Sequence, residues 1–412
     1  MKRLVLAFAC FLALVAATGN LLMAQGWSVQ PTGTVNYLWE IRFVDANFGL
    51  AVGDGGFVLR TTNGGSLWTV IQTSTQNSLY GLSLIDANIA VACGGQGVIY
   101  RTTDGGITWN PQTSGTTNDL TGQWFIGPNV GTIVGRHGTI LRTTNGGATW
   151  SPQTSPDTAS LYQPFFTDAN NGVAVGIMGT IIRTTDGGAN WTKVASGTTE
   201  DLYGLSFPTK DIGFATGGNG VILRTTNGGQ TWVPQNSWVS EILFSVSFVD
   251  QNIGTAVGGA GIVIKTTNGG ATWYGQNGAV GNRLHEVWFI NANNGWAVGT
   301  SGVITHTTDG GGPTSVRSLD QPDIPRSLSL EQNYPNPFNP STTIRFSLPE
   351  AGHVTLKVYN VLGDEVATLV NETIRVGVHQ VEWTADNVPS GVYLYRLTTG
   401  ASTVTRRMTL IK

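Results

Sequence analysis

Residues 101–109 read RTTDGGITW, and close copies of this string recur at six other places in the chain. The basic residue that opens each copy repeats every 41 residues without an insertion, at Arg60, Arg101, Arg142, Arg183, Arg224, Lys265 and His306. A leucine follows the same step, at Leu38, Leu79, Leu120, Leu161, Leu202, Leu243 and Leu284. A fixed period of this length indicates a repeat architecture of seven units.

Each unit contains four short runs of β-forming residues. Between Leu202 and Gln235 they read LYGLSF, IGFATG, GVILRTT and TWVPQ, and turn residues separate them. Four strands in a repeat of roughly 40 to 45 residues are typical of a β-propeller blade. A linear solenoid would need capping repeats at its ends, whereas a closed ring needs none. We therefore expect an all-β chain in which residues 25–313 form a seven-bladed β-propeller.

The tryptophan of the repeat predicts how the ring closes. It recurs from Trp68 to Trp273, but the next position in the series is Thr314. One period before Trp68 stands Trp27, in a GWSVQ segment that has no blade in front of it. We expect residues 27–31 to complete blade seven, so that the N-terminal strand removes an exposed sheet edge.

The repeated turn is expected to be structural. Asp104 can accept backbone N–H bonds across the turn, and Gly105 and Gly106 can take a positive φ. Because a neutral amide replaces the carboxylate as often as not, a calcium site is disfavoured, and we predict no metal and no cofactor. The residues at this position are Asn63, Asp104, Asn145, Asp186, Asn227, Asn268 and Asp309.

Composition limits the partners. The 412 residues carry a formal net charge of −3 and no cluster of Lys or Arg, so we expect neither nucleic acid nor an anionic membrane surface to be bound. Residues 1–24 read as a signal peptide, with a basic start and an apolar run; a lipoprotein signal that uses Cys10 is the alternative. We expect a monomer without a transmembrane segment in the mature chain. Its one remaining cysteine, Cys93, is expected to be a small buried residue and not a reactive thiol.

Candidate binding residues are sought where the blades differ. The residue after each repeated leucine is aromatic in most units and should lie near the mouth of the central channel, opposite the repeated turns. These positions either pack blade against blade or form a stacking surface for a glycan or peptide. They are Trp39, Tyr80, Thr121, Tyr162, Tyr203, Phe244 and His285.

Two carboxylates also break the repeat. Glu40 in blade one and Glu286 in blade seven become neighbours once the ring closes, and Arg42 is nearby in sequence. They form either a Glu–Arg–Glu salt link or a carboxylate pair that cleaves a glycoside. Weaker candidates for a binding patch are Arg136, His137 and Trp238.

The chain changes character after the propeller. Residues 314–327 form a polar, proline-containing linker, and residues 328–412 alternate apolar and polar positions between Gly, Pro and Asn turns. This pattern predicts a small Ig-like β-sandwich.

The repeated turn resembles the Asp-box, or bacterial neuraminidase repeat, whose pattern Thr102, Asp104, Gly106, Thr108 and Trp109 match. Unit one departs from it with Leu67, and unit seven has lost the tryptophan. The fuller unit is similar to the seven-bladed propellers of the photosystem II stability/assembly factor-like family. That resemblance implies the fold but not the family's chlorophyll-protein partners. Sialidases and xyloglucanases also have Asp-box propellers, but the arginine triad and tyrosine nucleophile of sialidases and the second propeller of xyloglucanases find no match here.

Four blocks in residues 328–412 resemble the type A C-terminal sorting domain of the Bacteroidetes type IX secretion system. They are NYPNPFNPSTTIRFSLP, VYNVLGDEV, PSGVYLYRL and the closing RRMTLIK. The resemblance implies Sec export to the periplasm, passage through the outer membrane and removal of this domain; a resident module like that of flagellar hook-capping proteins is the alternative. We thus expect a secreted or surface-displayed, non-enzymatic propeller that binds a protein or glycan. The alternative is an extracellular glycoside hydrolase that uses Glu40 and Glu286.

Overall fold

A computed structural model describes residues 26–312, 328–348, 352–374, 377–385, 388–400 and 402–411, with only the backbone at 377 and 378. The predicted signal peptide, including Cys10, and the predicted linker lie outside these residues. The chain divides into two compact units, one on each side of residues 313–327. In the described ranges, no helix is long and apolar enough to span a membrane.

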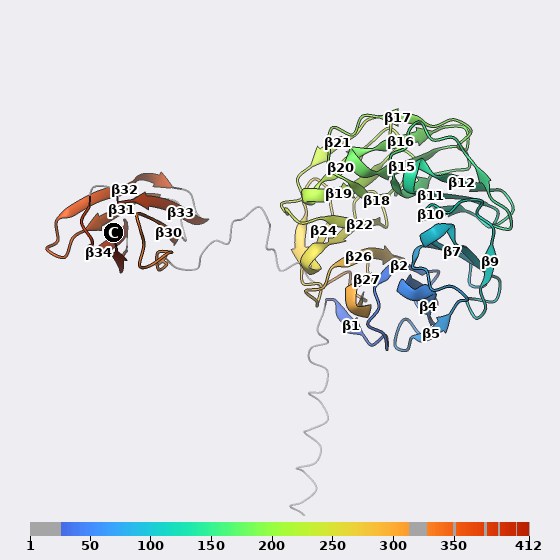
Figure 1. Cartoon of the computed structure of the whole chain (residues 1–412), viewed down its shortest axis with the longest axis horizontal. Helices are drawn as coiled ribbons and strands as arrows, with labels where there is room; N and C mark the ends of the chain where they lie inside the picture. The colour runs from blue at the N-terminus through green and yellow to red at the C-terminus, as the bar shows by residue number, and fades with distance from the viewer. Residues whose placement is uncertain are drawn as a thin grey trace, which may run out of the picture. The chain divides into compact units, whose positions relative to one another are not determined.

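The first unit is a wheel of seven four-stranded antiparallel sheets (Figure 1). The first three strands of each sheet run outward from the axis in chain order, and a short 3₁₀ turn joins the second and third strands. Blades one to four consist of β2 (Leu38–Phe43), β3 (Gly49–Gly53), η1 (Asp54–Gly56), β4 (Phe57–Thr61) and β5 (Thr69–Gln72); β6 (Leu79–Leu84), β7 (Ala90–Gly94), η2 (Gly95–Gly97), β8 (Ile99–Thr102) and β9 (Asn110–Gln112); β10 (Leu120–Ile126), β11 (Val130–Gly135), η3 (Arg136–Gly138), β12 (Ile140–Thr143) and β13 (Ser151–Pro152); and β14 (Leu161–Phe166), β15 (Gly172–Gly176), η4 (Ile177–Gly179), β16 (Ile181–Thr184) and β17 (Thr192–Val194). Blades five to seven consist of β18 (Leu202–Ser206), β19 (Gly213–Gly217), η5 (Gly218–Gly220), β20 (Ile222–Thr225) and β21 (Val233–Gln235); β22 (Leu243–Phe248), β23 (Gly254–Gly258), η6 (Gly259–Gly261), β24 (Val263–Thr266) and β25 (Tyr274–Gln276); and β26 (Leu284–Phe289), β27 (Gly295–Gly299), η7 (Thr300–Gly302), β28 (Ile304–Thr307) and β1 (Ser28–Gln30).

The N-terminal strand closes the ring, as predicted. β1 pairs antiparallel with β28, with Val29 opposite Thr305, and lies at the outer rim in Figure 1. Trp27 is buried next to this strand, and its Nε1 donates a hydrogen bond of 3.2 Å to Gln276 Oε1. Its ring meets Phe289 edge-on at 5.7 Å. The seven sheets remain separate, so no ladder joins neighbouring blades among the described residues.

Side-chain hydrogen bonds hold the repeated turn together. Asp104 Oδ1 accepts bonds from Thr108 N at 2.9 Å and Thr102 Oγ1 at 2.7 Å, and Gly106 N donates to Thr102 Oγ1 at 3.0 Å. Thr108 Oγ1 also donates to Asp104 Oδ2 at 2.6 Å. These donors favour the ionised carboxylate and lower the pKa of Asp104 to about 2. Asn145 serves equally, since its Oδ1 accepts Thr149 N at 3.0 Å.

In five blades the repeated basic residue donates a hydrogen bond to the next blade. Arg101 Nε donates to Gly146 O of the following turn at 2.7 Å, and Lys265 Nζ donates to Gly310 O at 2.8 Å. At the seam between blades seven and one, His306 takes this position and stacks on Trp296 at 4.6 Å. Cys93 is a buried free thiol that packs in the core between two blades.

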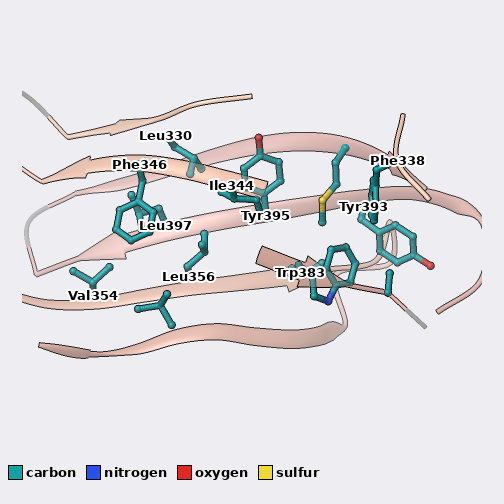
Figure 2. Packing of buried hydrophobic residues seen from close by; sticks show 14 of the residues in the cluster. Leu330, Phe338, Ile344, Phe346, Val354, Leu356, Trp383, Tyr393, Tyr395 and Leu397 are labelled. Atoms are coloured by element: carbon teal, nitrogen blue, oxygen red, sulfur yellow. The ribbon is translucent and has the colours of Figure 1, made fainter. Parts of the chain in front are cut away.

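The second unit is the predicted β-sandwich. One sheet has the order β29-β30-β33 and the other β32-β31-β34-β35. Figure 2 shows side chains from both sheets, among them Ile344 and Leu356, meeting in one core. The strands are β29 (Ser329–Leu330), β30 (Ser341–Leu348), β31 (Gly352–Tyr359), β32 (Glu365–Ile374), β33 (Gly377–Thr384), β34 (Gly391–Thr399) and β35 (Thr403–Leu410).

Candidate functional site

The blades present two different faces. The 3₁₀ turn of a blade bonds to the loop that precedes its first strand, as where Asp54 N donates to Tyr37 O at 3.0 Å. The repeated turn instead bonds to the connection between strands one and two, as where Gly64 N donates to Asn47 O at 2.9 Å. The residues that follow the repeated leucines therefore lie at the end of the channel opposite the repeated turns.

A cavity of about 310 Å³ opens on that face. We call it the collar cavity, because all seven positions that follow the repeated leucines line it. The structure also brings Glu40, Glu286 and Arg136 to this cavity, but not His137 or Trp238. Its lining consists of Trp39, Glu40, Tyr80, Thr121, Arg136, Tyr162, Gln163, Tyr203, Phe244, His285 and Glu286.

The collar rings contact one another as well as the cavity. Trp39 stacks on His285 with centroids 4.3 Å apart and meets Tyr80 edge-on at 5.5 Å. Tyr203 lies between Tyr162 at 5.0 Å and Phe244 at 5.2 Å. The rings thus pack blade against blade, as one of the two predictions has it, and the same side chains also line an open cavity.

The floor of the cavity is a buried Glu–Arg–Glu cluster. Arg42 Nη1 lies 2.5 Å from Glu286 Oε1, and the same guanidinium pairs with Glu40 Oε1. Glu40 Oε2 also accepts a hydrogen bond of 2.7 Å from Leu82 N. Burial raises the pKa of Glu40 to about 8; Arg42 opposes this shift, and the neighbouring Glu286 adds to it.

Large side chains occupy the axis below the floor. Arg42 lies over the Trp288 ring at 4.5 Å, and Trp124 stacks on Phe165 at 4.0 Å. Trp288 Nε1 donates to Phe43 O at 3.0 Å, which fixes that indole in place. The cavities that remain at this depth, on either side of Arg42, measure about 110 Å³ each. The collar cavity is therefore the roomier end of the channel.

Sequence reasoning missed several residues of the site. Tyr37 is 45% exposed and contacts the rings of Trp39 and His285 from the preceding loop. Asp54 Oδ1 accepts a bond of 2.7 Å from Trp39 Nε1 and orients that indole. Gln163 lines the cavity at the position that Glu40 takes in blade one. Only the aromatic character of Tyr37 could have indicated that it lies at the rim of the collar cavity. The loop that contains it does not follow the 41-residue repeat.

The weaker candidates lie on the exposed surface. The side chain of Arg136 is 60% exposed, and its Nε pairs with Asp119 Oδ2 at 3.0 Å. His137 follows it in η3 with a φ of 55°. Trp238 is 48% exposed in the loop after β21, away from the collar cavity. Arg136 therefore reaches the edge of the collar cavity, whereas His137 and Trp238 do not line it.

The fold and this site define a seven-bladed Asp-box propeller followed by a C-terminal β-sandwich. The chain belongs to the family of photosynthesis system II assembly factor YCF48, whose profile matches residues 115–195, 148–236, 190–277 and 234–327. An Asp-box repeat is matched at residues 100–111. Residues 332–412 match the secretion system C-terminal sorting domain. The chain is thus exported by the type IX secretion system, and its destination is the cell surface or the exterior.

Solved structures share the fold. YCF48 bound to D1 peptide is 19% identical over 70% of this chain and 98% of that chain, with a TM-score of 0.60. YCF48 from Cyanidioschyzon merolae is 23% identical over 68% and 98%, with a TM-score of 0.59. PorZ, a surface component of the type IX secretion system of Porphyromonas gingivalis, is 13% identical over 93% of this chain and 60% of that chain, with a TM-score of 0.53. No curated protein matches the chain significantly.

Proposed function

We propose that the propeller is a non-enzymatic binding module that holds a protein or glycan ligand in the collar cavity, outside the cell. The cavity itself carries this proposal, because aromatic side chains from six blades converge on one opening of about 310 Å³. Cavities with an apolar wall and a few convergent polar groups are the usual form of a binding site. The likeness to YCF48 bound to D1 peptide supports a peptide ligand by analogy of fold alone.

The binding test uses the chain without residues 1–24, immobilised and exposed to envelope extract and to a glycan array. Replacing Tyr162 and Tyr203 together by alanine should weaken capture about tenfold, because aromatic anchors dominate binding energy at such sites. Ile107→Ala is the matched control, since this residue is 60% exposed in the repeated turn on the other face. Capture that survives the double substitution contradicts the proposal, and absence of any ligand would favour a passive scaffold.

The glycoside hydrolase remains the second candidate, because Glu286 reaches Arg42 across the seam of the ring and there meets Glu40 of the same strand as Arg42. The surroundings of Glu40 favour a salt link with Arg42 over a catalytic role. Its side chain is 4% exposed, and its oxygens face Arg42 and Leu82 N, so it is poorly placed to reach a substrate. Turnover on a glycan panel that disappears in Glu40→Gln would favour the enzyme instead.

A further inference from the structure

We propose that the collar cavity takes up a positively charged group of its ligand, such as an arginine or lysine side chain, between its aromatic wall and Glu286. This inference rests on the proposed function and adds the chemistry of the ligand. It follows from three features of the site: the open carboxylate oxygen of Glu286 at the floor, the aromatic character of the wall, and the weak influence of the basic groups near the opening.

The floor leaves one carboxylate oxygen without a partner among the described residues. Two carboxylates share the single guanidinium of Arg42, which is 5% exposed and directed at both of them. Glu286 uses Oε1 for this pair, and no described residue donates a hydrogen bond to its Oε2. The side chain of Glu286 is 17% exposed at the cavity floor. A second cation would therefore find an open acceptor in a poorly solvated place.

The wall of the cavity suits a cation. The faces of aromatic rings attract positive charge, and Trp39, Tyr80, Tyr162, Tyr203 and Phe244 surround the opening from five blades. The carboxylates behind the wall add negative potential, since Asp54 accepts a bond from the Trp39 indole and Asp201 one of 3.3 Å from the Tyr203 hydroxyl.

Contacts between a cation and an aromatic ring already occur inside the propeller. The guanidinium of Arg42 lies 4.5 Å from the Trp288 centroid below the floor, and that of Arg283 lies 5.3 Å from Phe244 in the wall. Rings that surround an axial opening fit an unbranched side chain that enters along the axis. A pyranose ring would instead stack on one flat aromatic face, so a sugar is the competing occupant.

The basic groups at the cavity do not cancel this attraction. Arg136 pairs with Asp119 at 3.0 Å and is 60% exposed, so solvent screens its charge. Burial lowers the pKa of His285 below its usual value, which disfavours the positively charged form of this imidazole. Arg283 does not line the cavity.

The test measures the binding of small probes to the chain without residues 1–24 by isothermal titration calorimetry. The probes are the Nα-acetyl methylamides of arginine, lysine, norleucine and glutamate, together with methyl glucoside. We expect the arginine and lysine probes to bind about tenfold more tightly than norleucine, the factor that one partly desolvated cation contact gives. Glu286→Gln should remove this preference.

Two further variants make the test specific. Glu241→Gln removes the same charge from an exposed loop of the same face, outside the cavity, and should leave the preference unchanged. Phe244→Leu keeps an apolar side chain but removes a ring face, so it should weaken the cationic probes severalfold and leave norleucine unaffected. Thermal melts of each variant establish that it is folded.

Several results would overturn the inference. They are equal binding of norleucine or methyl glucoside, unchanged arginine binding in Glu286→Gln, and the absence of saturable binding by every probe. If capture of a partner still depends on Tyr162 and Tyr203 in these cases, the proposed function stands and only the charge of its ligand is wrong.

Discussion

Glu40 lies in surroundings that favour its protonated form, and this has a measurable effect on stability. Its pKa of about 8 in the folded chain exceeds the ordinary value of 4.5, so the folded chain binds this proton more tightly than the unfolded chain. The stabilisation is complete below about pH 4.5 and is lost as the pH rises toward 8.

We therefore expect the free energy of unfolding to fall by roughly 1 kcal/mol between about pH 7 and pH 8, where histidines contribute little. Chemical unfolding at several pH values measures the slope. Glu40→Gln should flatten it, and Glu241→Gln, an exposed carboxylate outside the cavity, should leave it unchanged. A slope that is the same in Glu40→Gln would show that another group binds the proton.

Asp104 provides the second prediction at the scale of single residues. Asparagine occupies the same position in four units, and Asn145 accepts Thr149 N as Asp104 accepts Thr108 N. Asp104→Asn should therefore change the free energy of unfolding by less than about 0.5 kcal/mol. Asp104→Ala removes every acceptor and should cost about 1–2 kcal/mol in urea unfolding. Equal losses in both variants would mean that the charge, and not the hydrogen bonds, stabilises the turn.

Among the elements, β1 is short but completes a blade, because its three residues supply the outer strand of blade seven. Trp27→Ala would empty a buried site against Phe289 and break the bond to Gln276, so we expect a loss of about 3 kcal/mol. Val29→Ala is the control, because Val29 lies in β1 itself and its side chain is 54% exposed. Calorimetric unfolding compares the two variants; equal unfolding temperatures would show that ring closure does not depend on this anchor.

The elements also show how far sequence reasoning reaches. The 41-residue period predicted the blades, the pairing of residues 27–31 with blade seven and the meeting of Glu40 with Glu286, because one rotation relates all equivalent positions. It could not predict Tyr37 or Asp54 at the rim, since loop conformation follows no period. The packing of Trp124 and Trp288 under the floor also escaped it, because this repeat position holds a different residue from blade to blade, such as Ser83 in blade two.

At the scale of the whole molecule, the export signal belongs to the second unit, and the binding function that we propose belongs to the propeller. The sorting domain has its own core, in which Ile344, Leu356 and Tyr395 are fully buried, so its fold does not depend on the propeller's core. We expect that deleting residues 328–412 leaves a folded propeller that accumulates in the periplasm of a host with a type IX secretion system. Cell fractionation and surface immunolabelling measure this outcome.

Residues 328–412 should also direct the export of another protein to which they are fused, if they alone carry the signal for passage through the outer membrane. A monomeric reporter that bears residues 1–24 at its N-terminus and 328–412 at its C-terminus should reach the cell surface or the medium, whereas the reporter with residues 1–24 alone should stay in the periplasm. The resident-module alternative predicts the opposite result for both proteins: undiminished delivery of the truncated propeller and retention of the fused reporter. Delivery of the reporter but also of the truncated propeller would place a second export signal in residues 25–327.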